Sequence, residues 1–249
     1  MNFYSVIIGT ELLNGRRKDA HFTFLNEQLL KRGWTHKASF VIEDDTNLMK
    51  NIFKLIKEDK DSVMFCFGGI GATPDDYTRQ IAAEVFTDSK MEYHQKAKEL
   101  IINQFGDEAY PYRIEMSHLP INAKLLKNVV NNVPGFYLEN RFFFTPGFPS
   151  MSQSMVIEAL DKHYLKNSIL TFRKSITIFA GENEIIEFMK NLPSSIEASS
   201  LPKLIEGKRR AVLSMSCKSE DIVNEYFLKA QEYLTNKNIQ YVLKDIFEK

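Results

Sequence analysis

The sequence predicts an α/β protein whose mostly parallel sheet is flanked by helices in a three-layer sandwich, followed by a small α+β domain. Two patterns along the chain support this prediction. Residues 3–86 alternate between short apolar runs and stretches with an apolar stripe at helical spacing, as in right-handed βαβ units. Residues 172–243 follow another order, strand, helix, strand, strand, helix, strand, which is typical of helices packed on one small sheet.

Length and composition agree with two globular, soluble domains. The chain has 249 residues, whereas a single domain typically has roughly 100–150. We place the boundary near residues 166–170, which gives domains 1–167 and 168–249. Lys plus Arg equals Asp plus Glu at 32 each, and this balance argues against a chain-wide surface for nucleic acid or for an anionic membrane.

The first domain is predicted to begin with three strands, each followed by a helix. The strands are the apolar runs 3–8, 34–42 and 62–67. The first helix begins near Asp19, a suitable N-cap, and ends at Gly33. The third helix continues to about Phe86. The second helix has its predicted buried stripe at Leu48, Ile52, Leu55 and Ile56.

The rest of the chain contains shorter predicted elements. In the first domain they are a polar helix over 91–105, an irregular stretch over 106–122, strands near 124–128 and 142–145, and a helix to about Tyr164. In the second domain they are strands over 172–179, 197–203, 210–217 and 239–243, a helix over 182–191, and a longer helix with Ser219 as its N-cap. We expect these strands to form a mixed sheet.

Polar residues follow each of the first three predicted strands. They are Gly9, Thr10 and Glu11 after the first strand, Glu43, Asp44 and Asp45 after the second, and residues 68–76 after the third. Ligands of parallel α/β sheets bind outside the carboxyl ends of the strands. We therefore expect these three groups to meet in one crevice.

The third group, GGIGATPDD over residues 68–76, has two interpretations. Thr73 suits an N-cap and Asp76 the third helical position, so the carboxylates would only cap a helix. The glycines, however, leave backbone N–H groups free to bind a phosphate. A phosphate beside Asp75 and Asp76 requires a cation between them, and a divalent metal such as Mg²⁺ would satisfy both partners.

Other kinds of site and location are disfavoured. The 5 His residues show no paired ligand spacing, and Cys66 and Cys217 lie in apolar runs typical of buried thiols, so no zinc site is expected. No apolar run reaches the roughly 18 residues that span a membrane, and the N-terminus lacks the basic segment of a signal peptide. We expect a cytoplasmic protein that binds neither membrane nor nucleic acid.

Four motifs together resemble one known family. They are GTELLNG (9–15), GGIGATPDDYT (68–78), NVPGF (132–136) and PGFPSM (146–151), with Asp44-Asp45 between the first two. In order and spacing they resemble the molybdopterin-binding (MoCF biosynthesis, MoaB/MogA-like) domain in the version of the CinA, competence/damage-inducible, family. The similarity covers residues 3–165. It implies a MogA-like fold, a small KH-type domain in the tail, and a homo-oligomer, which we expect to be a dimer. We expect the C-terminal amidohydrolase domain of full-length members to be absent, because the chain ends after the tail.

The resemblance also implies a function. The site would bind a pterin phosphate or an adenylated diphosphate ligand, and CinA-type members would hydrolyse ADP-ribose with a metal. We therefore expect metal-dependent hydrolysis of a nucleotide diphosphate such as ADP-ribose, with Mg, Mn or Co. Two alternatives remain: molybdopterin binding or molybdenum cofactor biosynthesis, and a non-catalytic regulatory module that binds such a ligand.

The implied site residues fall into three groups. Two acids would be catalytic and, with Asp75, would hold the metal: Asp44 and Asp76. The phosphate would be bound by Gly68, Gly69, Gly71, Thr73 and Thr78. The ligand rim would be formed by Thr10, Glu11, Asp19, Pro146 and Gly147.

Several rim positions depart from the family pattern. They are Ala20, His21, Asn131, Asn132 and Met151. These departures predict an altered substrate or binding without turnover. We expect His21 at a solvated helix position, with the rim as the alternative, and the basic run 16–18 either at a phosphate or in a solvated loop.

Overall fold

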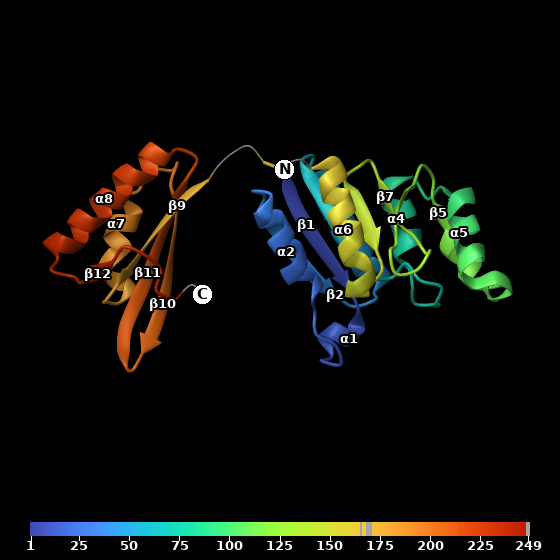
Figure 1. Ribbon diagram of the computed structural model, residues 1–249, viewed down its shortest axis with the longest axis horizontal. Coiled ribbons are helices and arrows are strands. Elements are labelled where there is room, and N and C mark those ends of the chain that lie inside the picture. The colour runs from blue at the N-terminus through green and yellow to red at the C-terminus, as the bar shows by residue number, and fades with distance from the viewer. Residues whose placement is uncertain (165, 168–170, 248–249) are drawn as a thin grey trace. The chain divides into compact units, whose positions relative to one another are not determined.

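The computed structural model describes residues 1–164, 166–167 and 171–247. Residues 168–170, which fall within the predicted boundary, lie outside the described residues. The chain divides into two compact units, Met1–Asn167 and Ser168–Lys249, and each is described here by itself (Figure 1).

The described residues of the first unit form eight strands and six α-helices, which Figure 1 labels where there is room. The strands are β1 (Asn2–Ile8), β2 (His36–Ile42), β3 (Ser62–Phe67), β4 (Met91–Tyr93), β5 (His118–Pro120), β6 (Lys124–Leu126), β7 (Gly135–Leu138) and β8 (Phe142–Thr145). The helices are α1 (Thr10–Leu13), α2 (His21–Lys31), α3 (Thr46–Glu58), α4 (Thr78–Phe86), α5 (Gln95–Phe105) and α6 (Pro149–His163), with short 3-10 turns η1 (Gly106–Ala109) and η2 (Arg113–Ser117). No helix in the described part of the chain is long and apolar enough to cross a membrane.

Six strands of this unit form one sheet in the order β2-β1-β3-β8-β7-β6. β1 pairs in parallel with β2 and β3, and β3 pairs in parallel with β8. β7 is antiparallel to both of its neighbours. The mostly parallel sheet flanked by helices confirms the predicted fold class. The sequence pattern misses β7, because four residues that follow Pro134 are too few to show an alternation.

Helices cover both faces of this sheet. On one face, Phe3 of β1 packs with Leu25 of α2 and Val156 of α6. On the other face, Val6 packs with Phe53 of α3 and with residues of α4. Figure 1 shows α2 and α6 together on one side of the strands. Because successive strand side chains point to opposite faces, both sets of β1 and β3 side chains are buried, which explains their unbroken apolar runs.

The buried face of α3 differs from the predicted stripe. Leu48 and Leu55 are 38% and 55% exposed, whereas Met49 and Phe53 are buried. The helix carries more apolar residues than one face can hold, so spacing alone is compatible with two stripes. Contact with β1 and α4 selects the one that includes Met49 and Phe53.

Residues 91–93 form a strand, where the sequence pattern predicts a helix. Met91–Tyr93 pairs antiparallel with His118–Pro120, and α5 begins only at Gln95, where the His94 ring accepts a hydrogen bond from Ala97 N at 3.3 Å. The strand exists because of a partner inside the predicted irregular stretch, which a local pattern cannot reveal.

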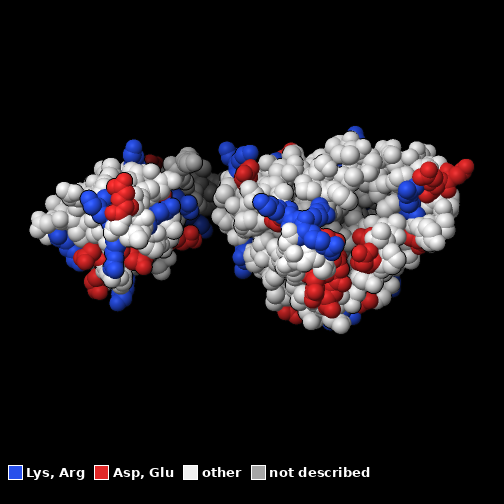
Figure 2. Space-filling model, turned by 90° about the horizontal axis from the view of Figure 1, so that it is seen from below, with Lys and Arg blue, Asp and Glu red and all other residues white. Residues whose placement is uncertain are grey.

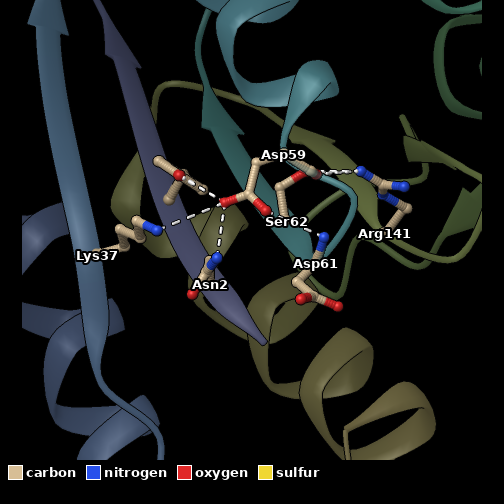
Figure 3. A network of polar contacts seen from close by, with 7 residues as sticks. Asn2, Lys37, Asp59, Asp61, Ser62 and Arg141 are labelled. Atoms are coloured by element: carbon tan, nitrogen blue, oxygen red, sulfur yellow. Dashed lines mark hydrogen bonds and ion pairs between the residues drawn. The ribbon is translucent and has the colours of Figure 1, made fainter.

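A polar network joins the ends at which β1 and β3 begin (Figure 3). The Asp59 carboxylate accepts hydrogen bonds from Asn2 Nδ2 at 2.7 Å and from Tyr4 OH at 2.8 Å. Lys37 Nζ of β2 lies 3.8 Å from the same carboxylate. Arg141, just before β8, donates to Asp59 O at 2.9 Å. This network, which we call the Asp59 network, connects the starts of four neighbouring strands.

The second unit is a small antiparallel sheet with helices. Its elements are β9 (Phe172–Ile178), η3 (Glu182–Ile185), α7 (Ile186–Lys190), β10 (Glu197–Ile205), β11 (Lys208–Cys217), α8 (Glu220–Asn236) and β12 (Tyr241–Val242). The order is β10-β11-β9-β12, and each neighbouring pair is antiparallel. The predicted mixed sheet is therefore wrong: β9 and β10 point the same way, but β11 lies between them. Ser219 Oγ accepts from Ile222 N at 3.4 Å and caps α8 as predicted.

Candidate functional site

The carboxyl ends of β2, β1, β3 and β8 lie side by side at one edge of the sheet. Backbone hydrogen bonds join the loops that leave them, because Gly9 N donates to Ile42 O and Gly68 N donates to Thr145 O, each at 2.9 Å. Figure 2 views this edge of the first unit from below Figure 1 and shows Lys and Arg side chains beside Asp and Glu side chains. The three polar groups of the sequence thus reach one edge of the sheet.

Asp44 and Thr10 form a pair at the β1 and β2 end of this edge. Asp44 Oδ2 accepts hydrogen bonds from Thr10 N at 3.0 Å and from Thr10 Oγ1 at 2.8 Å. The neighbouring Asp45 caps α3, since its Oδ1 accepts from Leu48 N at 2.6 Å. Asp44 therefore joins the loop after β2 to the loop after β1, whereas Asp45 fixes the start of α3.

The glycine loop, residues 68–73, follows β3 and has little room for side chains. Gly68 and Gly69 have φ values of +104° and +68°. A Cβ on Gly68 would lie 2.6 Å from Ile8 O, and a Cβ on Gly69 would overlap the Thr78 hydroxyl. Thr78 Oγ1 itself donates to Gly68 O at 2.9 Å, and Thr78 N donates to Gly69 O at 2.9 Å. Thr78 thus lies beneath the loop and fixes its shape.

Helix α4 begins at Thr78, later than the sequence predicts. Asp76 Oδ2 accepts hydrogen bonds from Thr73 N at 2.8 Å and from the Thr73 hydroxyl. The carboxylate therefore closes a turn over residues 73–76, and Thr73 does not cap a helix. The interpretation of Asp75 and Asp76 as caps of a helix is wrong, because α4 has Tyr77 as its N-cap.

A cavity of about 420 Å³ opens between the glycine loop and four other segments of the first unit. Its lining is mostly apolar. Phe105 and Met116 come from α5 and η2, and Phe148 from the loop after β8. Its remaining residues are Gly69, Ile70, Gly71, Ala72, Thr73, Asp76, Asn128, Asn131, Val133, Pro146, Gly147 and Met151.

The cavity contains only part of the predicted site. Those of its lining residues that the sequence predicts are Gly69, Gly71, Thr73, Asp76, Pro146 and Gly147. Gly68 and Thr78 support the loop from below. The predicted residues that do not line the cavity are Asp44, Asp75, Thr10, Glu11 and Asp19. Strand order explains why Asp44, Thr10 and Glu11 lie apart from the cavity. These residues follow β2 and β1, which are on one side of β3, whereas the cavity residues Pro146 and Gly147 follow β8, which is on the other side.

The carboxylates do not form a metal site. Within the described residues there is no group of three or more His, Cys, Asp or Glu side chains that could hold a metal ion. Asp44 is bound to Thr10, Asp76 is bound to Thr73, and Asp75 is exposed. This set of donors does not fit the divalent metal that the sequence suggests.

His21 is buried under the cavity rim, contrary to the expected solvated position. Only 5% of it is exposed, and its ring stacks on Phe67 with 4.5 Å between centroids. Nε2 lies 3.2 Å from Gly147 O, and Nδ1 lies 3.3 Å from Ser152 Oγ. Burial lowers the pKa of His21, so the neutral ring donates from Nε2 to the carbonyl and accepts at Nδ1. Asp19, predicted as the N-cap of this helix, accepts from His21 N at 2.8 Å.

Arg17 holds the same rim loop. Its Nη2 donates to Gly147 O at 3.2 Å, and its guanidinium lies 5.4 Å from the centre of the Phe148 ring. The basic run 16–18 therefore supports the cavity wall through Arg17, which contacts the Gly147 backbone and the Phe148 ring.

The sequence prediction misses the apolar wall of the cavity. Val133 and Phe148 lie within the NVPGF and PGFPSM motifs and could be found from those motifs. Phe105 and Met116 have no local signal, because only the packing of α5 and η2 brings them to the glycine loop. Asn128 is also missed; its Oδ1 accepts from Val130 N at 3.0 Å and shapes the loop before β7.

Comparison with known proteins gives one family match and several relatives. A family model described as a probable molybdopterin binding domain matches residues 5–166. A CinA-like protein of Fusobacterium nucleatum subsp. nucleatum is 28% identical over 192 residues, which are 75% of this chain and 47% of the relative. A CinA-like protein of Prochlorococcus marinus is 26% identical over 253 residues, 94% of this chain and 58% of the relative. The chain thus spans about half the length of these relatives.

A solved structure shares the fold of the first unit. The crystal structure of the protein CinA with unknown function from Thermoplasma acidophilum superposes with a TM-score of 0.56 at 24% sequence identity. The match covers 65% of this chain and 98% of the other. At this identity the similarity concerns the fold alone.

Proposed function

Because the chain belongs to the probable molybdopterin-binding family, we propose that it binds a pterin that carries a phosphate group. The ligand would lie in the cavity between the glycine loop and the loop Pro146–Phe148. This assignment corresponds to molybdopterin binding or to a step of molybdenum cofactor biosynthesis.

The two-sided lining of the cavity is the observation that supports this proposal best. One side offers the backbone of Gly69–Ala72, where N–H groups can bind phosphate oxygens. The other side offers Phe105, Met116 and Phe148, which suit a flat heterocycle. Its volume of about 420 Å³ lies within the roughly 300–1,000 Å³ of small-molecule sites.

The family match overturns the hydrolase expected from the sequence. Residues 5–166 match a molybdopterin binding domain, and the match gives no support to an ADP-ribose pyrophosphatase. The geometry agrees with this correction, since Asp44 lies outside the cavity that contains Asp76, and the donors for a bridging metal do not converge.

A matched pair of pterins tests the proposal. Neopterin monophosphate and neopterin differ only in the phosphate, and their binding can be followed by pterin fluorescence and by calorimetry. We expect the monophosphate to bind at least about tenfold more tightly, because charge-assisted hydrogen bonds to the loop would be lost without the phosphate.

Two aromatic variants connect this binding to the cavity. Phe148→Ala removes part of the apolar wall and should weaken both pterins, whereas Tyr112→Ala removes an exposed aromatic side chain that does not line the cavity. The proposal fails if neither pterin binds the wild-type protein, or if the two variants weaken binding equally.

A further inference from the structure

Arg79 is a buried arginine directly beneath the glycine loop. It follows Thr78 in the first turn of α4 and is only 5% exposed. No carboxylate in the described residues forms an ion pair with it, and its Nε has no hydrogen-bond partner there. A buried cation without a paired acid is costly, so its position requires an explanation.

The Arg79 guanidinium is bound to backbone carbonyls of the glycine loop. Nη1 donates to Ile70 O at 2.6 Å and also to Gly71 O. The peptide bonds here are trans, since the one cis bond of the described chain is Tyr110–Pro111. In a planar trans peptide the N–H points away from the C=O. The N–H groups of Gly71 and Ala72 therefore point away from Arg79.

These N–H groups have no partner within the described residues. Neither the backbone nor the side-chain hydrogen bonds of the described chain include the N–H of Gly69, Ile70, Gly71 or Ala72 as a donor. The same four residues line the cavity. Several adjacent free N–H groups around one hollow form the kind of surface that binds an oxyanion.

Asp76 would repel an anion in this cavity unless a positive charge lay near. Its carboxylate lines the cavity together with the loop. Burial lowers the pKa of Arg79, while Asp76 and Glu115 act in the opposite direction. Because arginine stays protonated even when buried, the Arg79 guanidinium places a permanent positive charge beneath the loop and close to Asp76.

We propose that Arg79 is the positioning residue of the phosphate subsite, which it creates by holding the carbonyls of Ile70 and Gly71 inward and by balancing Asp76. Arg79 then takes the place of the metal ion suggested by the glycines and carboxylates of the sequence. The identity of the ligand as a phosphorylated pterin rests on the proposed function, but the role of Arg79 applies to any phosphate in this loop.

Two substitutions of Arg79 and one matched control test the proposal. Arg79→Met removes the charge and the donors, and Arg79→Lys keeps the charge but not the planar fork. Arg141→Met is the control, because Arg141 also donates to a backbone carbonyl and has a buried Nε without a partner, but it belongs to the Asp59 network at the opposite edge.

The readout is the affinity ratio of neopterin monophosphate to neopterin. A general loss of stability would weaken both pterins, whereas loss of the phosphate subsite lowers only the ratio. We expect Arg79→Met to reduce the ratio roughly tenfold or more, Arg79→Lys to give an intermediate ratio, and Arg141→Met to leave it unchanged. A folded Arg79→Met protein with the wild-type ratio would overturn the proposal.

A measurement on the wild-type protein covers the cases in which Arg79→Met does not fold or no pterin binds. Inorganic phosphate should shift the amide NMR resonances of Gly69, Ile70, Gly71 and Ala72 and the Arg79 Nε resonance in a saturable way. Absence of these shifts at saturating phosphate would refute the subsite. If phosphate shifts them but neither pterin binds, the pterin proposal fails and the role of Arg79 stands.

Discussion

Gly69 lies at the point where the glycine loop and the start of α4 are packed most tightly. Its φ of +68° is unfavourable for any residue with a Cβ, and that Cβ would also overlap the Thr78 side chain. Gly15 has a similar φ of +80° but nothing within 4 Å of a Cβ. The pair separates the cost of backbone conformation from the cost of overlap.

Gly69→Ala should therefore destabilise the protein more than Gly15→Ala. We expect the free energy of unfolding to fall by about 1 kcal/mol for Gly15→Ala, from backbone strain alone, and by about 2–4 kcal/mol for Gly69→Ala, from strain plus overlap. Urea unfolding of both variants measures the difference. Equal losses would show that Thr78 moves aside without cost.

His21 should make stability depend on pH. Because burial lowers its pKa below the ordinary 6.5, the unfolded chain takes up a proton first as the pH falls. Its contribution to stability is thus complete above pH 6.5 and declines below it, by at most about 1.4 kcal/mol per pH unit. His21→Gln should show a smaller decline between pH 7.5 and 5.5.

The comparison of the wild-type protein with the His21→Gln variant gives the contribution of His21 to the pH dependence of stability. The pKa values of His36 and His163 are also lowered by burial, but both residues are present in wild type and variant, so their effect cancels. Unfolding curves with the same pH dependence in both proteins would contradict the assignment of a neutral, buried His21.

The Asp59 network joins four strands of the sheet, so its loss should lower the free energy of unfolding of the protein. A hydrogen bond from Tyr4 OH, more than any other contact, holds the pKa of Asp59 below the ordinary 3.8, while burial and this contact raise the pKa of Tyr4 to about 12. A carboxylate with a lowered pKa contributes stability above its unfolded pKa, and this contribution disappears as the pH falls through the folded value.

Asp59→Asn should lower the free energy of unfolding at pH 7 by about 1 kcal/mol, the usual net contribution of such hydrogen bonds. The figure is modest because 21% of the side chain is exposed to water. The difference from wild type should shrink as the pH approaches 3. Asp61→Asn, at the exposed neighbour, is the control and should leave stability unchanged; an equal loss there would point to charge alone.

The elements themselves were predictable to different degrees. Strands β3 and β8 follow from unbroken apolar runs, because both of their faces are buried. The start of α4 does not follow from the TPDD pattern, since Asp76 accepts from the Thr73 backbone and closes a turn. Strand β4 depends on a partner, β5, that lies beyond a whole helix in the chain.

The whole molecule consists of two units, and the cavity is lined by residues of the first alone. A fragment of residues 1–167 should therefore fold and bind neopterin monophosphate with an affinity within about threefold of the full chain, since it retains every residue that lines the cavity. Calorimetry on both proteins measures this. A folded fragment that binds more than tenfold more weakly would mean that residues 168–249 contribute to the site.

The order of residues along the chain was enough to indicate the α/β class, the strands that end at the site, and the glycine loop. These features depend on the local periodicity of apolar residues and on the backbone freedom of glycine, and both can be recognised from neighbouring residues in the sequence. The division of the predicted acids between two places, the burial of His21 and the apolar wall from Phe105 and Met116 were decided by strand order and packing. The same is true of Arg79: a sequence shows a charged residue in a helix, and only its burial under the loop makes it a partner of the carbonyls of Ile70 and Gly71. Contacts between distant segments have no local pattern, so their chemistry is visible only once the chain has folded.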